Sequence, residues 1–170
     1  MTTRTDYTDE EWKNIKAGPL LAGAYVSTVV NSGPIDTAKE ALAISQSLAD
    51  LVKKGSANEL IATLIDEVQL KEGQAVQTRE GIAINVKTSE DLRKATIDTL
   101  QQASAALTKA TPEETAEYKQ FVLTVAQRVA EAGKEGQFLG IGGTRVSAAE
   151  TRAIQEIGAA LGPAPLSPTG

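Results

Sequence analysis

The chain has 170 residues, of which 41% are apolar and 4% aromatic, and its 17 basic against 22 acidic side chains give a net charge of −5. A chain of this length can bury a hydrophobic core without disulfides, and its acidic balance argues against a nucleic-acid partner, which would require a clustered positive field. These residues include no cysteine and no histidine, which excludes disulfides, thiolate nucleophiles, and imidazole bases or metal ligands.

The first residues lack the apolar core of a secretory signal. The longest uncharged run, residues 17–35, is interrupted by Gly18-Pro19 and Gly33-Pro34, which make it a poor membrane span. We therefore expect a soluble, cytoplasmic protein without a membrane partner.

The first helix start lies near the N-terminus. Thr8 and Glu11 have the spacing of a capping box, in which each side chain accepts a hydrogen bond from the backbone N–H of the other residue. Tyr7 and Trp12 flank this box at the positions of a hydrophobic staple. These two aromatic side chains are therefore expected to stabilise the start of a helix.

The helix that begins after Thr8 is expected to end near Ala17. Gly18-Pro19 follows, and proline both lacks a backbone N–H and disfavours helix in the residue before it. The sequence therefore predicts a break or kink here, and a second, apolar helix from Pro19 to Val30.

Helix-start signals recur along the rest of the chain. Residues 35–54 show helical spacing of apolar side chains. Residues 74–86 are expected to be an ordered linker, although Ile82, Ile84 and Val86 alternate as in a short strand.

The predicted helix starts are Ser56 with Glu59, Thr88 or Ser89 with Glu90 and Asp91, Thr111 with Pro112, Glu113 and Glu114, and Ser147 with Glu150. The predicted buried positions include Leu60, Ile61 and Leu64, then Tyr118, Phe121, Val122, Val125 and Val129, and last Ala148, Ile154, Ile157 and Leu161.

These elements predict an all-α fold, an antiparallel helical bundle of four long helices with two shorter ones. We expect a single domain over residues 7–161, with flexible tails at residues 1–6 and 162–170. A shift of 81 residues places Thr8 on Ser89 and Leu42 on Leu123, which suggests an internal duplication. Alanine-rich helices also align by chance, so both interpretations are open.

The glycine-rich stretch before the last helix is the candidate binding site. Its glycines and a helix start offer free backbone N–H groups and a positive dipole end, the features of an anion site. An arginine two residues before the cap adds a bidentate donor for phosphate or carboxylate. The candidate anion-binding residues are Gly140, Gly142, Gly143, Arg145 and Ser147.

The alternative for this stretch is packing without a ligand. Four apolar side chains lie in it, and apolar side chains are most often buried. In that case the glycines only allow the chain to pass close to other helices. The four residues are Phe138, Leu139, Ile141 and Val146.

Acidic side chains form the other candidate cluster. Glu113, Glu114 and Glu117 lie within about one helical turn, and Asp66 and Glu67 are adjacent. First-turn acids complement the helix dipole, which explains them without a ligand. A weak divalent-cation site is the alternative, although such sites need several converging oxygens. We predict no metal site, no cofactor and no catalytic residues.

Three segments together resemble a family of small bacterial helical proteins. They are the Y-T-D-E-E-W opening at residues 7–12, the S-G-P turn at residues 32–34, and the F-L-G-I-G-G stretch at residues 138–143 with the V-S-x-x-E that follows it. The resemblance covers most of residues 7–161. It implies a single soluble helical domain of bacterial origin and implies no activity.

We therefore expect a non-catalytic bacterial protein that acts through a protein partner or self-association as a homo-oligomer. The alternative is a small-ligand or anion-binding protein that uses the loop 140–147 and Arg145. An enzyme using carboxylate or lysine chemistry is the third hypothesis, and no constellation of residues supports it.

Overall fold

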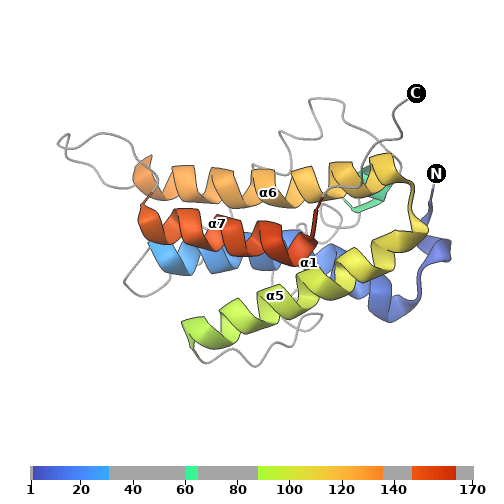
Figure 1. Cartoon of the computed structure of the whole chain (residues 1–170), viewed down its shortest axis with the longest axis horizontal. Helices are drawn as coiled ribbons and strands as arrows, with labels where there is room; N and C mark the ends of the chain where they lie inside the picture. The colour runs from blue at the N-terminus through green and yellow to red at the C-terminus, as the bar shows by residue number, and fades with distance from the viewer. Residues whose placement is uncertain (1, 31–59, 65–87, 136–146, 164–170) are drawn as a thin grey trace, which may run out of the picture.

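The structure, a computed structural model, describes residues 2–30, 60–64, 88–135 and 147–163 (Figure 1). Within these ranges every regular element is a helix, which confirms the predicted all-α class. Residues 60–64 are helical. The other elements are η1 (Arg4–Asp6), α1 (Asp9–Val30), α5 (Ser89–Ala106), η2 (Leu107–Lys109), α6 (Pro112–Glu135) and α7 (Ala148–Leu161).

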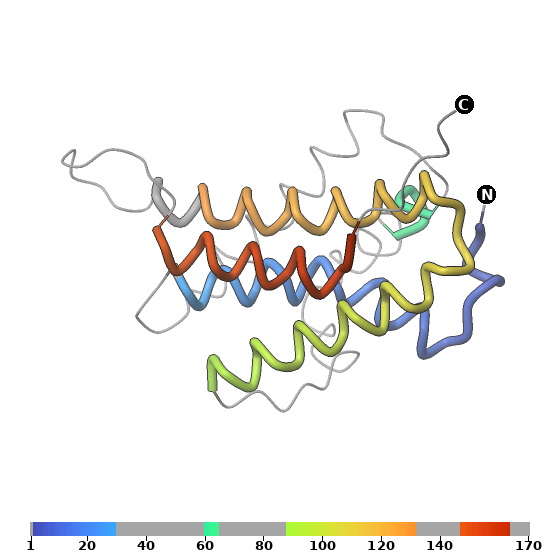
Figure 2. The backbone as a smooth tube through the Cα atoms, viewed as in Figure 1, coloured from blue at the N-terminus to red at the C-terminus, as the bar shows by residue number. Residues whose placement is uncertain are grey.

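Helices α1 and α7 form the centre of the arrangement, because they contact each other and both contact α5 and α6. Helices α1 and α6 run in one direction, and α5 and α7 run in the opposite direction (Figures 1 and 2). The predicted set of four long and two shorter helices, and the internal duplication, involve residues 31–59 and 65–87. These residues lie outside the described ranges, so both remain predictions.

The predicted break at Gly18-Pro19 is wrong. Helix α1 is a single element of 22 residues from Asp9 to Val30, with Pro19 inside it. A proline at position 19 cannot donate the usual helical hydrogen bond to the carbonyl four residues earlier, which is that of Ile15. The helix can continue only if that buried carbonyl finds another donor, because an unpaired buried acceptor is costly.

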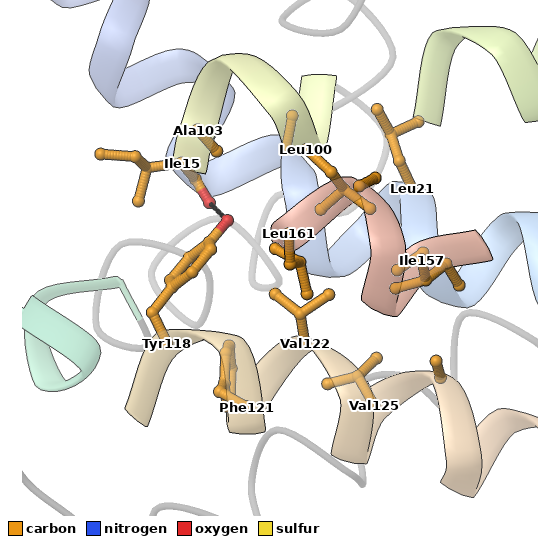
Figure 3. Packing of buried hydrophobic residues seen from close by; sticks show 14 of the residues in the cluster. Ile15, Leu21, Leu100, Ala103, Tyr118, Phe121, Val122, Val125, Ile157 and Leu161 are labelled. Atoms are coloured by element: carbon orange, nitrogen blue, oxygen red, sulfur yellow. Dashed lines mark hydrogen bonds between the residues drawn. The ribbon is translucent and has the colours of Figure 1, made fainter. Parts of the chain in front are cut away.

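Tyr118 of α6 is that donor. Its hydroxyl donates to the carbonyl oxygen of Ile15 at 2.8 Å, and both side chains are fully buried (Figure 3). Gly18 makes the approach possible, because a Cβ at this position would overlap the Tyr118 hydroxyl and lie 3.1 Å from Leu100. Gly18, Pro19 and Tyr118 therefore act together, and the proline is accommodated without ending the helix.

Among the described residues, the core is built from apolar side chains of α1, α5, α6 and α7 and of residues 60–64. The predicted stripe of α6 is confirmed, with every one of its five members buried, and so are Leu60, Ile61 and Leu64. On α7 the predicted Ile157 and Leu161 are buried and Ile154 is partly buried against the core, whereas Ala148 is exposed. Ala153, which was not predicted, is buried. Side chains of α1, α5, α6 and α7 pack around Tyr118 and Leu161 (Figure 3).

The predicted capping boxes of Thr8 and Ser147 are confirmed, and capping boxes also form at the helix starts predicted at Thr88 and Thr111. In each, the first residue's hydroxyl accepts from the backbone N–H of the acidic residue, whose carboxylate accepts from the first residue's N–H. Ser56 and Glu59 lie outside the described ranges. The four boxes are Thr8 with Glu11, Thr88 with Asp91, Thr111 with Glu114, and Ser147 with Glu150.

Residues 2–6 lie before α1, and the flexibility predicted for residues 1–6 and 162–170 remains a prediction. Residues 4–6 form the 3-10 turn η1, and the backbone N–H of Thr2 donates to Glu114 of α6 at 2.8 Å. The predicted staple is also present, since the rings of Tyr7 and Trp12 lie 5.8 Å apart and both are buried. Among the described helices, none is long and apolar enough to cross a membrane.

Candidate functional site

The predicted anion-binding loop is described at one residue only. Gly140, Gly142, Gly143 and Arg145 lie outside the described ranges, so their arrangement remains a prediction. Ser147 is the N-cap of α7. What the structure shows at this site is therefore the start of α7.

The polar atoms of Ser147 are engaged in the capping box. Its hydroxyl accepts from the backbone N–H of Glu150 at 3.2 Å, and its own N–H donates to the Glu150 carboxylate. Glu150 is only 4% exposed. Its carboxylate already complements the positive end of the α7 dipole, so it disfavours a second anion at the same place.

The acidic cluster at the start of α6 divides into structural and exposed members. Glu113 and Glu117 are exposed, whereas Glu114 is buried and accepts from the backbone N–H groups of Thr2 and Thr111. Burial alone would raise the pKa of Glu114, but these hydrogen bonds outweigh burial and lower it. The described residues contain no group of three or more acidic side chains placed to hold a metal ion.

A polar cluster that the sequence analysis missed joins three helices. Glu156 of α7 accepts from the Tyr25 hydroxyl of α1 at 2.9 Å. Arg93 of α5 donates to the same carboxylate through Nε at 2.7 Å and through a terminal nitrogen at 3.2 Å, and it also pairs with Glu90 at 3.0 Å. The two arginine bonds form a bidentate pair, the strongest geometry for such a contact.

The protonation states of this cluster follow from its contacts. The hydrogen bonds from Arg93 lower the pKa of Glu156, although burial opposes this effect. Burial and the Glu156 carboxylate raise the pKa of Tyr25 to about 12. At neutral pH Glu156 is therefore ionised and fully engaged while Tyr25 is protonated, so neither group is poised to exchange a proton. The cluster serves to hold α1, α5 and α7 together.

This cluster gives the protein a specific acid response. The lowered pKa of Glu156 means that its stabilising effect is present above the ordinary glutamate value of 4.5 and is lost as the pH falls through the folded-state value. We expect Glu156→Gln to lower the free energy of unfolding at neutral pH. The deficit relative to wild type should shrink on acidification below about pH 4.

Urea unfolding of both proteins at several pH values measures this response. Glu131→Gln is the matched control, since it removes the same charge from an exposed position on α6. A Glu156→Gln deficit that is the same at every pH would show that the ion pair with Arg93 contributes nothing to stability.

The C-terminus of α7 is also held by polar groups of other helices. The hydroxyl of Ser104 on α5 donates to the carbonyl of Leu161 at 2.8 Å, and the Lys119 ammonium of α6 donates to the carbonyl of Pro163 at 2.6 Å. Burial lowers the pKa of Lys119. Gly162 takes the positive φ of 72° that a glycine C-cap allows. A cation at the negative end of the helix dipole is in a stabilising position.

Comparison of the chain with protein-family models, with curated proteins and with solved structures finds no match.

Proposed function

We propose that this chain is a non-catalytic bacterial protein of the cytoplasm that acts through protein–protein contacts, with a second copy of itself as the first partner to test. The bacterial and cytoplasmic parts of the proposal come from the sequence resemblance and from the composition. The non-catalytic part is supported by how the described polar side chains are used.

One observation carries the proposal: several buried polar side chains bind the protein's own backbone, and the hydroxyls of Tyr7 and Tyr25 bind its own side chains. Tyr118 donates to Ile15, Glu114 accepts from two backbone N–H groups, and the Lys119 ammonium donates to the end of α7. Thr96 donates to the carbonyl of Leu92 at 2.8 Å. Across the described residues, no buried side-chain nitrogen or oxygen lacks a hydrogen-bond partner.

A catalytic site uses its ionisable groups differently. Its acids, bases and nucleophiles must face a substrate, and their pKa values are tuned toward the working pH. Here the pKa of Glu114 and that of Glu156 are lowered, away from neutrality, and that of Tyr25 is raised to about 12. These shifts are produced by burial and by hydrogen bonds within the protein, several of them between helices, as in a structural frame.

The alternative function, anion binding by the loop 140–147, has weaker support. The described member, Ser147, uses its hydroxyl and its N–H within the capping box. The buried carboxylate of Glu150 also places negative charge where an anion would lie. An anion would have to be bound by Arg145 and the glycines without the start of α7.

Sedimentation velocity over a wide range of protein concentration tests self-association. We expect a discrete oligomer that dissociates on dilution, because a specific interface gives a closed assembly of defined size. A monomer at every concentration would contradict self-association and leave only a different protein as partner.

Thermal unfolding of wild type and of Arg145→Ala with phosphate, nucleotides and sulfate distinguishes self-association from anion binding by the loop. Ligand at about 100 times its dissociation constant adds roughly 2.7 kcal/mol. A phosphate-specific rise in Tm that Arg145→Ala abolishes, without any oligomer, would replace the proposal with the anion-binding function.

A further inference from the structure

Residues 2–6 form a small polar unit, here called the clasp, that lies over the start of α1. None of the residues in its 3-10 turn is buried. Hydrogen bonds attach it: Thr2 N–H donates to Glu114 at 2.8 Å, Arg4 to the carbonyl of Tyr7 at 2.9 Å, and Lys109 to the carbonyl of Asp6 at 3.4 Å. An ion pair between Arg4 and Asp9 and the hydrogen bond from the Tyr7 hydroxyl to Thr2 add to these contacts. The clasp therefore adds hydrogen bonds to the structure but little apolar burial.

The clasp covers an aromatic pair. Trp12 is 2% exposed and Tyr7 is 4% exposed. The guanidinium carbon of Arg4 lies 5.6 Å from the centre of the Trp12 ring, in a cation–π position, and the Tyr7 hydroxyl donates to the Thr2 hydroxyl at 3.2 Å. Moving the clasp away would uncover the face of Trp12 that Arg4 covers.

The clasp and the helices differ in what holds them. The helices are fixed by a continuous apolar core that includes Tyr7 and Trp12 themselves. Apart from the buried Glu114 and Tyr7, the groups that hold the clasp are exposed or half-exposed polar groups, whose contacts water can replace at little cost. Segments with few apolar contacts open at a lower free energy than the core does.

We propose that the clasp opens locally while α1, α5 and α6 stay folded, and that this opening is a conformational device that controls access to Trp12. In the closed state Arg4 and Thr2 cover the aromatic pair. In the open state one face of Trp12 meets solvent and Glu114 loses the hydrogen bond from Thr2. The proposal is independent of the partner that the protein binds.

Native-state amide hydrogen exchange tests the local opening. The Asp6 and Tyr7 amides report on the clasp, because they donate to the carbonyls of Thr3 and Arg4. The Leu100 and Val122 amides report on the helices. We expect the clasp amides to be measurably protected, and their exchange rate to be insensitive to low denaturant concentrations. Their exchange should still be roughly a hundredfold or more faster than that of the helix amides.

Two exchange results would overturn the proposal. Clasp amides that exchange at the rate of the helix amides, with the same dependence on denaturant, would show that the clasp opens only when the whole protein unfolds. Clasp amides without any protection would show that the closed state does not form in solution.

Acrylamide quenching of Trp12, the sole tryptophan of the chain, gives a second readout. Arg4→Ala removes the side chain that covers the ring, so we expect stronger quenching with an unchanged helical circular dichroism spectrum. Lys94→Ala is the matched control, because it removes a positive charge from an exposed position of α5. Equal quenching in the two variants would show that the clasp does not control access to Trp12.

Discussion

Replacing Gly18 with alanine is expected to destabilise the protein by about 1–5 kcal/mol, although alanine is normally the better helix residue. A Cβ at position 18 would overlap the Tyr118 hydroxyl and come within 3.1 Å of Leu100. Overpacking of a buried site costs about 1–3 kcal/mol. Pushing Tyr118 away would also leave the buried carbonyl of Ile15 unpaired, which costs about 1–3 kcal/mol more.

The matched control is Gly158→Ala in α7. Gly158 is also a glycine inside a helix, but a Cβ there would meet only Leu123, at an ordinary contact distance of 3.8 Å. We expect this variant to be stabilised by about 0.5–1 kcal/mol, the usual gain from replacing glycine within a helix. Urea unfolding of both variants measures the contrast. A Gly18→Ala variant as stable as Gly158→Ala would contradict the close approach of Tyr118.

Tyr118→Phe is expected to cost about 1–3 kcal/mol, because it removes only the hydroxyl and leaves the Ile15 carbonyl buried without a donor. Burial raises the pKa of Tyr118 above its ordinary value, so the hydroxyl is protonated and can donate at neutral pH. For a chain of this length the loss corresponds to about 2–4 °C in Tm per kcal/mol.

Tyr7→Phe is the control for the tyrosine substitution. Tyr7 is buried as well, but its hydroxyl donates to the hydroxyl of Thr2, which is only partly buried and can bind water instead. Its loss should cost less than about 1 kcal/mol. If Tyr7→Phe and Tyr118→Phe lower the free energy of unfolding equally, the Ile15 carbonyl is not the reason for the effect.

The helix starts could be predicted from the sequence because their chemistry is local. Thr8 with Glu11, Thr88 with Asp91 and Ser147 with Glu150 lie three residues apart, so each pair forms its hydrogen bonds whatever the rest of the chain does. The burial of the apolar stripe of α6 could also be predicted, since five apolar side chains at helical spacing lie on one side of a helix.

The course of α1 could not be predicted because its cause lies far away in the chain. By the local rule, Gly18-Pro19 breaks or kinks a helix. The group that compensates for the missing N–H is the hydroxyl of Tyr118, which follows Ile15 by 103 residues. A single sequence shows that both residues exist but not that they meet.

The candidate site shows the same division between local and distant causes. Ser147 was correctly placed at a helix start, but the burial of Glu150 beside it was not foreseen. The contacts of Glu156 with Tyr25 and Arg93 span 131 and 63 residues, and no motif links these three side chains. The glycines and Arg145 of the predicted loop stay a prediction.

The most direct test of the account is a double-mutant cycle between Pro19→Ala and Tyr118→Phe, read as free energies of unfolding in urea. Pro19→Ala restores a backbone N–H that can donate to the Ile15 carbonyl. We predict that Tyr118→Phe costs about 1–3 kcal/mol in wild type but less than about 1 kcal/mol in the Pro19→Ala background. An equal cost of Tyr118→Phe in both backgrounds would contradict the claim that Tyr118 replaces the hydrogen bond that Pro19 removes.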